Sequence, residues 1–184
     1  MPLPPVGDLQ IREAVATDRT VIGDVHRAAF PADESTQVAS LASELLAEHT
    51  TPPVLTLVAG VGRLLVGHVA FSPVSDTRDD QWSAYILAPL GILPQWQRRG
   101  VGSRLVAAGM QRLRDDGVHR LFVYGDPDYY GRFGFNAIDA EPYAAPYALQ
   151  FPHGWLSVAL NPWPGPTSAA RLQCVAALRN PELW

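Results

Sequence analysis

Residues 87–104 read LAPLGILPQWQRRGVGSR, and this stretch decides the fold predicted for the chain. An apolar run ends at Pro94, the turn residues 97–102 follow, and apolar residues then recur at helical spacing over 101–114. This pattern predicts a strand, a glycine-bearing turn and a helix. Because the first N–H groups of a helix have no acceptor within it, such a turn can hold an anion. The stretch therefore predicts a phosphate-binding turn.

Two other interpretations of the turn compete with phosphate binding. The glycines can serve only to pack a strand against a helix. The turn is also similar to the Gly-x-Gly-x-x-Gly fingerprint of dinucleotide-binding proteins, but Leu105 stands where the third glycine belongs. The chain also lacks a leading strand-helix-strand unit, so we reject a nicotinamide dinucleotide as the ligand.

Composition indicates a folded chain of ordinary domain size. The 184 residues are 47% hydrophobic and 17% charged, which argues against disorder. The net charge is 14 − 18 = −4, which argues against general nucleic-acid binding. Between Leu90 and Phe135, however, seven arginines and four acids sum to +3, which leaves −7 for the remainder. A local basic segment favours a small polyanionic ligand over a long polymer.

Missing residue types exclude several chemistries. The chain has no lysine, which excludes a Schiff-base lysine and a Walker-type P-loop. Cys174 is the single cysteine, so neither an internal disulfide nor a cysteine zinc site can form, and we expect no metal site. We identify no secretory leader and no apolar run long enough to span a bilayer. We therefore expect a soluble, cytoplasmic protein that binds neither nucleic acid nor membrane.

Periodicity predicts one α/β domain over residues 1–184, without internal repeats. Residues 1–8 are expected to be a flexible lead-in, and 136–184 to supply C-terminal strands and substrate-side loops. The first expected helix follows the N-cap Thr17-Asp18, has Val21, Ile22, Val25 and Ala29 on its apolar face, and is interrupted by Pro31. Further helices are expected over about 35–46, 101–114 and 128–132. The expected strands are 9–14, 54–59, 64–71, 82–93, 119–124 and 155–160. Residues 72–81 are expected to form a loop, and 171–178 fits either a helix or a strand.

The order of these elements, together with two motifs, resembles the GNAT superfamily of N-acetyltransferases. The motifs are Gly67-His68-Val69-Ala70-Phe71-Ser72-Pro73 and Gly125-Asp126-Pro127-Asp128-Tyr129-Tyr130-Gly131-Arg132-Phe133-Gly134-Phe135, which look like those of a bacterial subgroup of predicted N-acetyltransferases. The resemblance covers residues 9–135 well and the C-terminal part loosely. It implies a GNAT-type α/β fold, with a mixed, mostly antiparallel sheet splayed near its middle and helices on both faces.

The resemblance also implies an acetyl-CoA site, carried over residue by residue. The cosubstrate's pyrophosphate is expected to lie on Gln97, Arg98, Arg99, Gly100, Val101, Gly102 and Ser103, with Arg104 following in the first helical turn. The glycines let the backbone approach the phosphates, and the serine adds a hydroxyl donor. Leu90, Gly91, Ile92 and Leu93 are expected to pair with the pantetheine amides. Pro89 suggests a bulge there, which in the family aims an N–H at the thioester oxygen.

Tyr130 stands where the family usually has the tyrosine that protonates the departing CoA thiolate, so it is expected to be catalytic and to contact the cosubstrate. A phenol with a reference pKa of about 10 is protonated at neutral pH and can act as an acid. Two alternatives are that Tyr130 is a core residue and that its neighbour Tyr129 is the exposed one. The general base is open among Glu34, Asp126 and His68, each of which also has an ordinary structural explanation.

We predict transfer of an acetyl group from acetyl-CoA to a primary amine, by direct attack in a ternary complex. The substrate is a small-molecule or peptide amine whose identity the sequence does not contain. The alternative is a non-catalytic acyl-CoA-binding sensor or structural module, and a third hypothesis is an acyltransferase for longer chains. The resemblance implies that homodimers are common. The aromatic residues between 143 and 155 either line a substrate pocket or cover the edge of the sheet.

Overall fold

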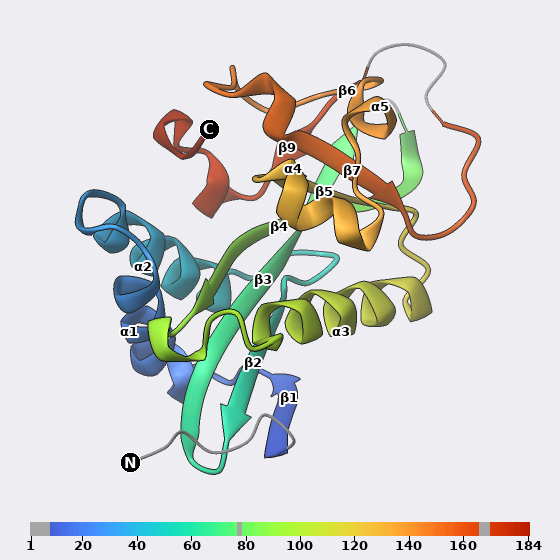
Figure 1. The fold of residues 1–184 in the computed structure, drawn as a ribbon. Helices are drawn as coiled ribbons and strands as arrows, with labels where there is room; N and C mark the ends of the chain where they lie inside the picture. Colours follow the sequence, from blue (N-terminus) through green and yellow to red (C-terminus); the bar gives the residue numbers. More distant parts are fainter. Residues whose placement is uncertain (1–7, 77–78, 166–169) are drawn as a thin grey trace. The chain divides into compact units, whose positions relative to one another are not determined.

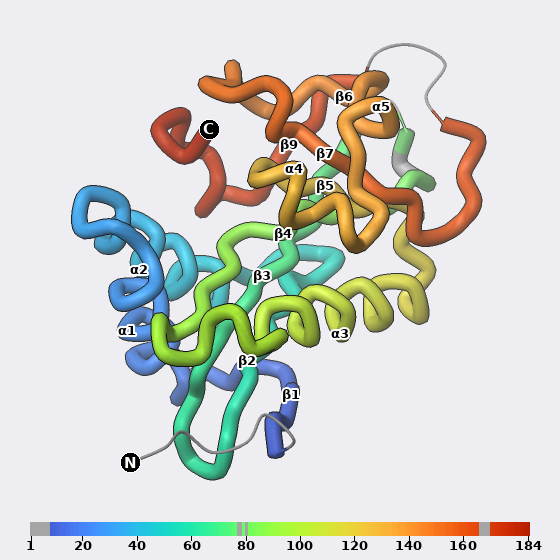
Figure 2. Tube along the Cα trace, viewed as in Figure 1, coloured from blue at the N-terminus to red at the C-terminus, as the bar shows by residue number. Residues whose placement is uncertain are grey.

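The computed structural model describes residues 8–76, 79–165 and 170–184 (Figures 1 and 2). The chain divides into two compact units. The first comprises the described residues up to Phe71 together with Pro89–Gly109, and the second comprises those of Ser72–Ala88 and Met110–Trp184. Within the described ranges, no helix is both long and apolar enough to cross a membrane. Apart from residue 8, the expected lead-in lies outside the described residues, and the single domain stays a prediction.

The predicted helices and strands occur in the predicted order, and α5 and β6 are additional. The helices are α1 (Arg19–Ala29), α2 (Ala32–Ala47), α3 (Val101–Asp115), α4 (Pro127–Tyr130) and α5 (Ala137–Ala140). The strands are β1 (Leu9–Glu13), β2 (Leu55–Val61), β3 (Leu64–Asp76), β4 (Asp79–Ile92), β5 (Arg120–Tyr124), β6 (Tyr143–Ala144), β7 (Trp155–Ala159), β8 (Ala170–Arg171) and β9 (Gln173–Cys174).

The sheet is mixed and mostly antiparallel, which confirms the predicted fold class. Among the described residues, seven strands form one sheet with the order β1-β2-β3-β4-β5-β7, and β9 pairs with β3. The pairs β1–β2, β2–β3, β3–β9 and β5–β7 are antiparallel, whereas β4–β5 is parallel. The short strands β6 and β8 form a separate parallel pair.

In the first unit, β3 is covered by helices on both faces. Successive side chains of a strand point to opposite faces. A Cβ atom added at Gly67 would lie 3.1 Å from Leu105 of α3, so position 67 faces that helix. His68 points the other way and forms a hydrogen bond with His26 of α1. Helices α1 and α2 therefore cover one face of this part of the sheet, and α3 covers the other (Figure 1).

The two helical layers are packed on the sheet through different contacts. On the α1 and α2 side, Ile22, Ala42 and Val58 form a fully buried cluster. On the α3 side, Phe71 lies so close to Gly109 that a Cβ atom added there would be 2.1 Å from the Phe71 ring. Glycine at position 109 thus allows α3 to pack directly on the ring.

In the second unit, aromatic rings from four strands build the core. Phe122 of β5 stacks on Trp155 of β7 with ring centroids 5.2 Å apart, and Tyr143 of β6 stacks on Trp82 of β4 at the same distance. All four rings are buried. Tyr143 and Trp155 are therefore core residues of this unit.

Three predicted element assignments need correction. Residues 72–81 are not a loop, because β3 continues to Asp76 and β4 begins at Asp79, while residues 77–78 lie outside the described part. The extension of β3 has a partner distant in sequence, since Val74 pairs with Cys174 of β9. Helix α2 begins at Ala32 rather than near 35, and Val21 is exposed rather than on the apolar face of α1. Within 171–178, both strand and helical turn occur.

The contact at Gly109 generates a test of the fold. Replacing a helical glycine with alanine normally stabilises a helix by about 1 kcal/mol. For Gly109→Ala we expect the opposite, a loss of about 1–3 kcal/mol, because the added methyl overlaps the buried Phe71 ring. Gly23→Ala is the matched control, since only the mobile end of Arg27 and a serine hydroxyl lie near its added Cβ. Urea unfolding of both variants measures the difference, and equal stabilities would contradict the packing described.

Candidate active site

The predicted phosphate-binding turn joins β4 to α3 in the first unit. The Leu93 N–H donates to the Val66 carbonyl at 2.9 Å, and a 3₁₀ turn over Pro94–Trp96 follows. The Gln97 side-chain amide donates back to the Ile92 carbonyl at 3.1 Å, which closes the turn on the end of the strand. Two residues of the turn have left-handed backbone conformations, Arg98 with φ 56° and Gly100 with φ 81°. Such alternations turn successive backbone N–H groups toward a common point.

The start of α3 leaves backbone donors available. The first bond that closes the helix runs from the Arg104 N–H to the Gly100 carbonyl at 3.0 Å. The N–H groups of Val101, Gly102 and Ser103 precede this bond, so they have no acceptor within the helix. The first turn of α3 contains no acidic residue that could occupy these donors. The helix dipole adds a partial positive charge at the same place.

The three arginines of this region differ in their surroundings. Arg98 is exposed. The Arg99 guanidinium lies 4.7 Å from the centre of the fully buried Trp96 ring, so it is held over the turn by a cation–π contact. Arg104 donates to the Leu9 carbonyl of β1 at 3.1 Å. Because of this contact, Arg104 is tied to the sheet as well as to the helix.

The segment expected to meet pantetheine, Leu90 to Leu93, is the last part of β4. The parallel register of β4 with β5 ends at Leu87↔Val123, and Pro89, which has no N–H to donate, follows. Gly91 is buried, whereas Leu90, Ile92 and Leu93 are half-buried. A Cβ atom added at Gly91 would lie 2.6 Å from Nδ1 of His26, so the imidazole ring rests directly on the glycine backbone.

His68, one of the three candidate bases, is hydrogen-bonded and buried. Its Nδ1 lies 2.8 Å from Nε2 of His26, and both residues have 0% exposure. Burial lowers the pKa of His26 to about 4. Burial and the neighbouring His26 lower the pKa of His68 to about 3, and the charge of Asp18 opposes this only in part. The two imidazoles are therefore neutral at physiological pH.

Sequence reasoning missed His26. The signal was its place beside Ile22 and Val25 on the buried face of α1, where a histidine needs a hydrogen-bonding partner. Only the pairing of α1 with β3 supplies that partner.

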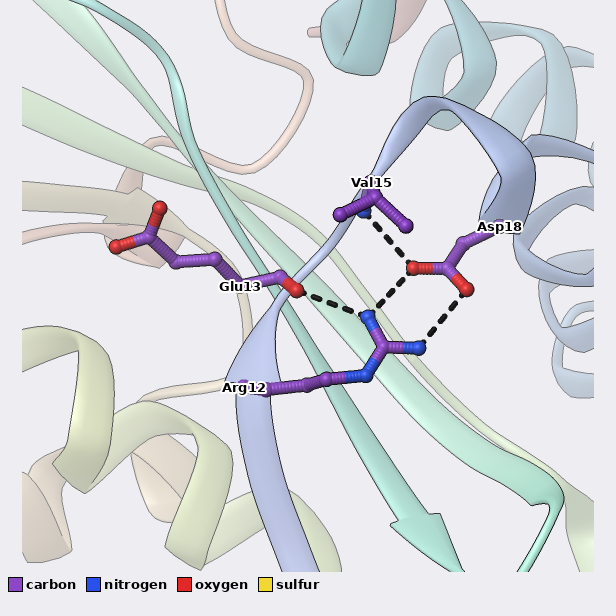
Figure 3. Close-up of polar contacts among 4 residues, drawn as sticks. All are labelled: Arg12, Glu13, Val15 and Asp18. Carbon is purple, nitrogen blue, oxygen red and sulfur yellow. Dashed lines mark hydrogen bonds and ion pairs between the residues drawn. The ribbon is translucent and has the colours of Figure 1, made fainter.

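Arg12 and Asp18 form an ion pair between the end of β1 and the start of α1 (Figure 3). The Arg12 guanidinium donates to both Asp18 carboxylate oxygens, at 2.7 and 2.9 Å, and the Val15 N–H donates to the same carboxylate at 2.9 Å. The guanidinium also donates to the Glu13 carbonyl at 2.9 Å. The hydrogen bonds from Arg12 lower the pKa of Asp18. Asp18 is thus occupied by structural contacts.

Tyr130 ends α4 in the second unit. A Cβ atom added at Gly125 would lie 2.6 Å from the Tyr130 ring, so this ring is seated against backbone. Tyr129 and Phe135 meet it edge-on, with centroids 4.9 and 5.8 Å away. Burial, and to a lesser degree Tyr129 and Asp126, raise the pKa of Tyr130 well above its ordinary value. Within the described part of the chain, no hydrogen bond joins the Tyr130 hydroxyl to another protein group.

The remaining two candidate bases are exposed carboxylates. Asp126 precedes α4, and its side chain accepts from the Asp128 N–H at 2.9 Å as an N-cap. Glu34 lies in the first turn of α2. The structure thus gives Asp126 a capping role and places Glu34 on the surface, at a helix start that stabilises negative charge.

The buried histidines predict a pH dependence of stability. Between their lowered values and the ordinary histidine pKa of about 6.5, the unfolded chain binds protons that the folded chain does not. The free energy of unfolding should therefore fall as the pH falls, by on the order of 2 kcal/mol per histidine between pH 7 and pH 5. The pKa of Asp18 is lowered from 3.8, so this carboxylate titrates below the window.

Urea unfolding at a series of pH values measures this slope. The double variant His26→Phe/His68→Phe should lose most of it, and the exposed His49→Asn control should keep it. A double variant with an unchanged slope would contradict the assignment.

Comparison with known proteins gives the family. Residues 21–135 match the family model described as the Acetyltransferase (GNAT) family. The uncharacterized N-acetyltransferase YjhQ of Escherichia coli K12 is 32% identical over 152 residues, which span 80% of this chain and 84% of that protein. The uncharacterized N-acetyltransferase YhbS of the same strain is 38% identical over 72 residues, 39% of this chain and 42% of its own length.

Solved structures agree with the family match. A GNAT family acetyltransferase from Brucella melitensis in complex with acetyl-CoA has a TM-score of 0.72 and 28% identity, with 92% of this chain and 97% of that chain covered. YhbS from Escherichia coli in complex with CoA has the same fold, with a TM-score of 0.80, 23% identity, and 94% and 93% coverage. The chain therefore belongs to the GNAT family of acetyltransferases and is an acetyl-CoA-dependent acyltransferase.

Proposed function

We propose that this acetyltransferase transfers the acetyl group to a primary amine, which attacks the thioester directly while both substrates are bound. The observation that carries the proposal is the turn between β4 and α3, with two left-handed residues and the unpaired first N–H groups of a helix. Several backbone donors and a helix dipole at one place form an arrangement that commonly binds phosphate groups in proteins.

The residues of this turn fit the pyrophosphate of acetyl-CoA. A Cβ atom placed on Gly100 would have no heavy atom within 4 Å, so the backbone there is open to a ligand. The exposed Arg98 is the arginine we expect to contact phosphate directly, and Arg99, held over Trp96, adds positive charge. In this proposal Arg104 does not contact the phosphates directly, because its guanidinium donates to the Leu9 carbonyl. Its contribution is the position of its positive charge. Bound acetyl-CoA supplies an activated acetyl thioester.

The strand before the turn is proposed to align that thioester. Leu90, Gly91 and Ile92 are proposed to pair their backbone groups with pantetheine, and an N–H near Leu90 or Gly91 to donate to the oxygen that becomes negative during attack. Leu93 would meet pantetheine with its half-buried side chain, because its N–H donates to the Val66 carbonyl and its carbonyl accepts from the Trp96 N–H. Fixed donors aimed at a developing oxyanion are among the largest contributions to acyl transfer. The half-buried positions of Leu90 and Ile92 are compatible with a ligand along this segment.

Tyr130 is proposed to donate its phenolic proton to the departing sulfur. Burial keeps the phenol protonated, which supports a role as proton donor. No hydrogen bond joins its hydroxyl to another described protein group. The same burial weakens the phenol as an acid, so we expect the proton to move as the carbon–sulfur bond breaks. The amine is proposed to lose its proton to Glu34 or Asp126, both exposed, whereas buried His68 is not placed to meet a substrate.

The first test is release of free CoA thiol from acetyl-CoA in the presence of a panel of primary amines. The wild-type protein should release thiol with at least one amine. Tyr130→Phe should lower kcat on the order of 10²-fold, because general-acid catalysis is lost, while the Kd for acetyl-CoA stays within about twofold.

Tyr129→Phe is the matched control, since it removes the neighbouring hydroxyl and should leave kcat near wild type. Unchanged turnover in Tyr130→Phe would remove this tyrosine from the chemistry. Tight acetyl-CoA binding without thiol release from any amine would favour the alternative, a CoA-binding sensor or structural module.

The second test concerns the phosphate-binding turn. Gly102→Leu places a side chain where the backbone must approach the pyrophosphate, and it should raise the Kd for CoA by at least about tenfold. Ala107→Leu, at an exposed position of the same helix, is the matched control and should bind CoA as wild type does. Calorimetric titration with CoA measures both, and undiminished affinity in Gly102→Leu would argue against this site.

A further inference from the structure

The hydrogen-bonded pair of His26 and His68 has no part in the chemistry proposed above. The pair joins α1 to β3, with Nε2 and Nδ1 2.8 Å apart and the rings nearly perpendicular. Both side chains are fully buried. One imidazole must donate and the other must accept, so the neutral pair has one shared hydrogen bond and a defined choice of tautomers.

Stability alone does not explain this pair. The outer nitrogens, Nδ1 of His26 and Nε2 of His68, are buried without a hydrogen-bond partner in the described structure. A buried polar group without a partner costs more free energy of folding than one ordinary hydrogen bond returns. Apolar side chains of similar volume would fill the same space at lower cost. A pair that costs stability is a candidate for a role in function.

The position of the His26 ring indicates that role. A Cβ atom at residue 91 would lie 2.6 Å from its Nδ1 and 2.7 Å from its Cε1, so the ring occupies the space above the Gly91 backbone. Phe30 stacks against the same ring, with centroids 5.9 Å apart and an interplanar angle of 27°. The ring is therefore held from three sides, by Phe30, by His68 and by β4.

We propose that His26 and His68 are positioning residues, which hold the Gly91 segment of β4 in the geometry that aligns the acetyl thioester. This inference depends on the proposed placement of the thioester at Leu90 and Gly91. The hydrogen bond fixes the rotation of the His26 ring, and the ring fixes the backbone on which it rests. A displacement of about 1 Å at a reacting group can lower the rate by about 10²-fold. A small shift of the Gly91 backbone after loss of the His26 contact is therefore enough to lower the rate of acetyl transfer.

The pair is placed to position the strand rather than to accept the substrate's proton. Both outer nitrogens are enclosed, and neither imidazole has exposed surface. The groups that face the pair are the Gly91 backbone, the Phe30 ring and, through its charge, Asp18. Asp18 is already bonded to Arg12.

The test compares kcat with acetyl-CoA affinity in variants of the pair. His26→Phe keeps a ring but removes the hydrogen bond, and we expect kcat to fall at least about tenfold while the Kd for acetyl-CoA changes less than about threefold. His68→Phe should have the same effect. The double variant should be no worse than either single variant, because residues that share one bond are not additive. His26→Gln, which can restore a hydrogen bond to His68, should recover part of the rate.

Ile22→Ala is the matched control for general damage to α1. Ile22 is fully buried in the same helix and packs against Ala42 and Val58. Its truncation leaves a cavity and lowers the stability of the protein, yet it should leave kcat and Kd near wild type at a temperature where the variant is folded. If His26→Phe behaves as Ile22→Ala does, the positioning role is wrong. A change in the pH dependence of kcat/KM in His26→Gln would also overturn it, since that would mean proton transfer by the pair.

A second measurement does not depend on turnover. In ¹H–¹⁵N NMR spectra, the Gly91 amide signal should shift when acetyl-CoA binds and should already be displaced in His26→Phe, but not in Ile22→Ala. An undisplaced Gly91 signal in His26→Phe would overturn the inference. If the wild-type protein binds acetyl-CoA but acetylates no amine, the proposed transfer fails, and the Gly91 signal alone then decides the positioning role.

Discussion

Burial of β3 on both faces is the constraint on which the first unit depends. Its alternate side chains meet different helical layers, His68 facing α1 and Gly67 facing α3. Gly67 and Gly109 remove side chains where α3 comes closest to the strand, and Phe71 fills the space at Gly109. Because interiors are packed at the density of organic crystals, this arrangement allows little movement of α3. The start of α3, and with it the turn proposed to bind phosphate, is thereby fixed against the sheet.

A site built in this way uses backbone more than side chains. The donors proposed for the pyrophosphate are the first N–H groups of α3, and those proposed for the thioester belong to the end of β4. Backbone groups keep their directions as long as the packing holds. The three arginines near the turn have different surroundings. Arg99 is held over Trp96 and Arg104 is bonded to Leu9, while Arg98 is exposed.

The buried histidine pair differs from the apolar cluster that also joins α1 to the sheet. Ile22 and Val58 belong to that cluster. A hydrogen bond between neutral imidazoles adds direction that apolar contacts do not, because it selects one orientation of each ring. The cost is two unsatisfied nitrogens and a dependence of stability on pH.

The sequence alone predicted the main helices and strands in their order and the position of the glycine-bearing turn, because these depend on periodicity and on local backbone rules that act within a few residues of the chain. The mixed sheet was implied by the resemblance to the GNAT superfamily. Tertiary structure decided what depends on partners distant in sequence. Residues 74 and 75 pair with β9 in the extension of β3, the aromatic residues Tyr143 and Trp155 belong to the core, and His26 meets His68, which lies 42 residues away. No local pattern contains such contacts, because they exist only once segments distant in the sequence are packed together, as α1 is packed on β3 in the case of His26 and His68.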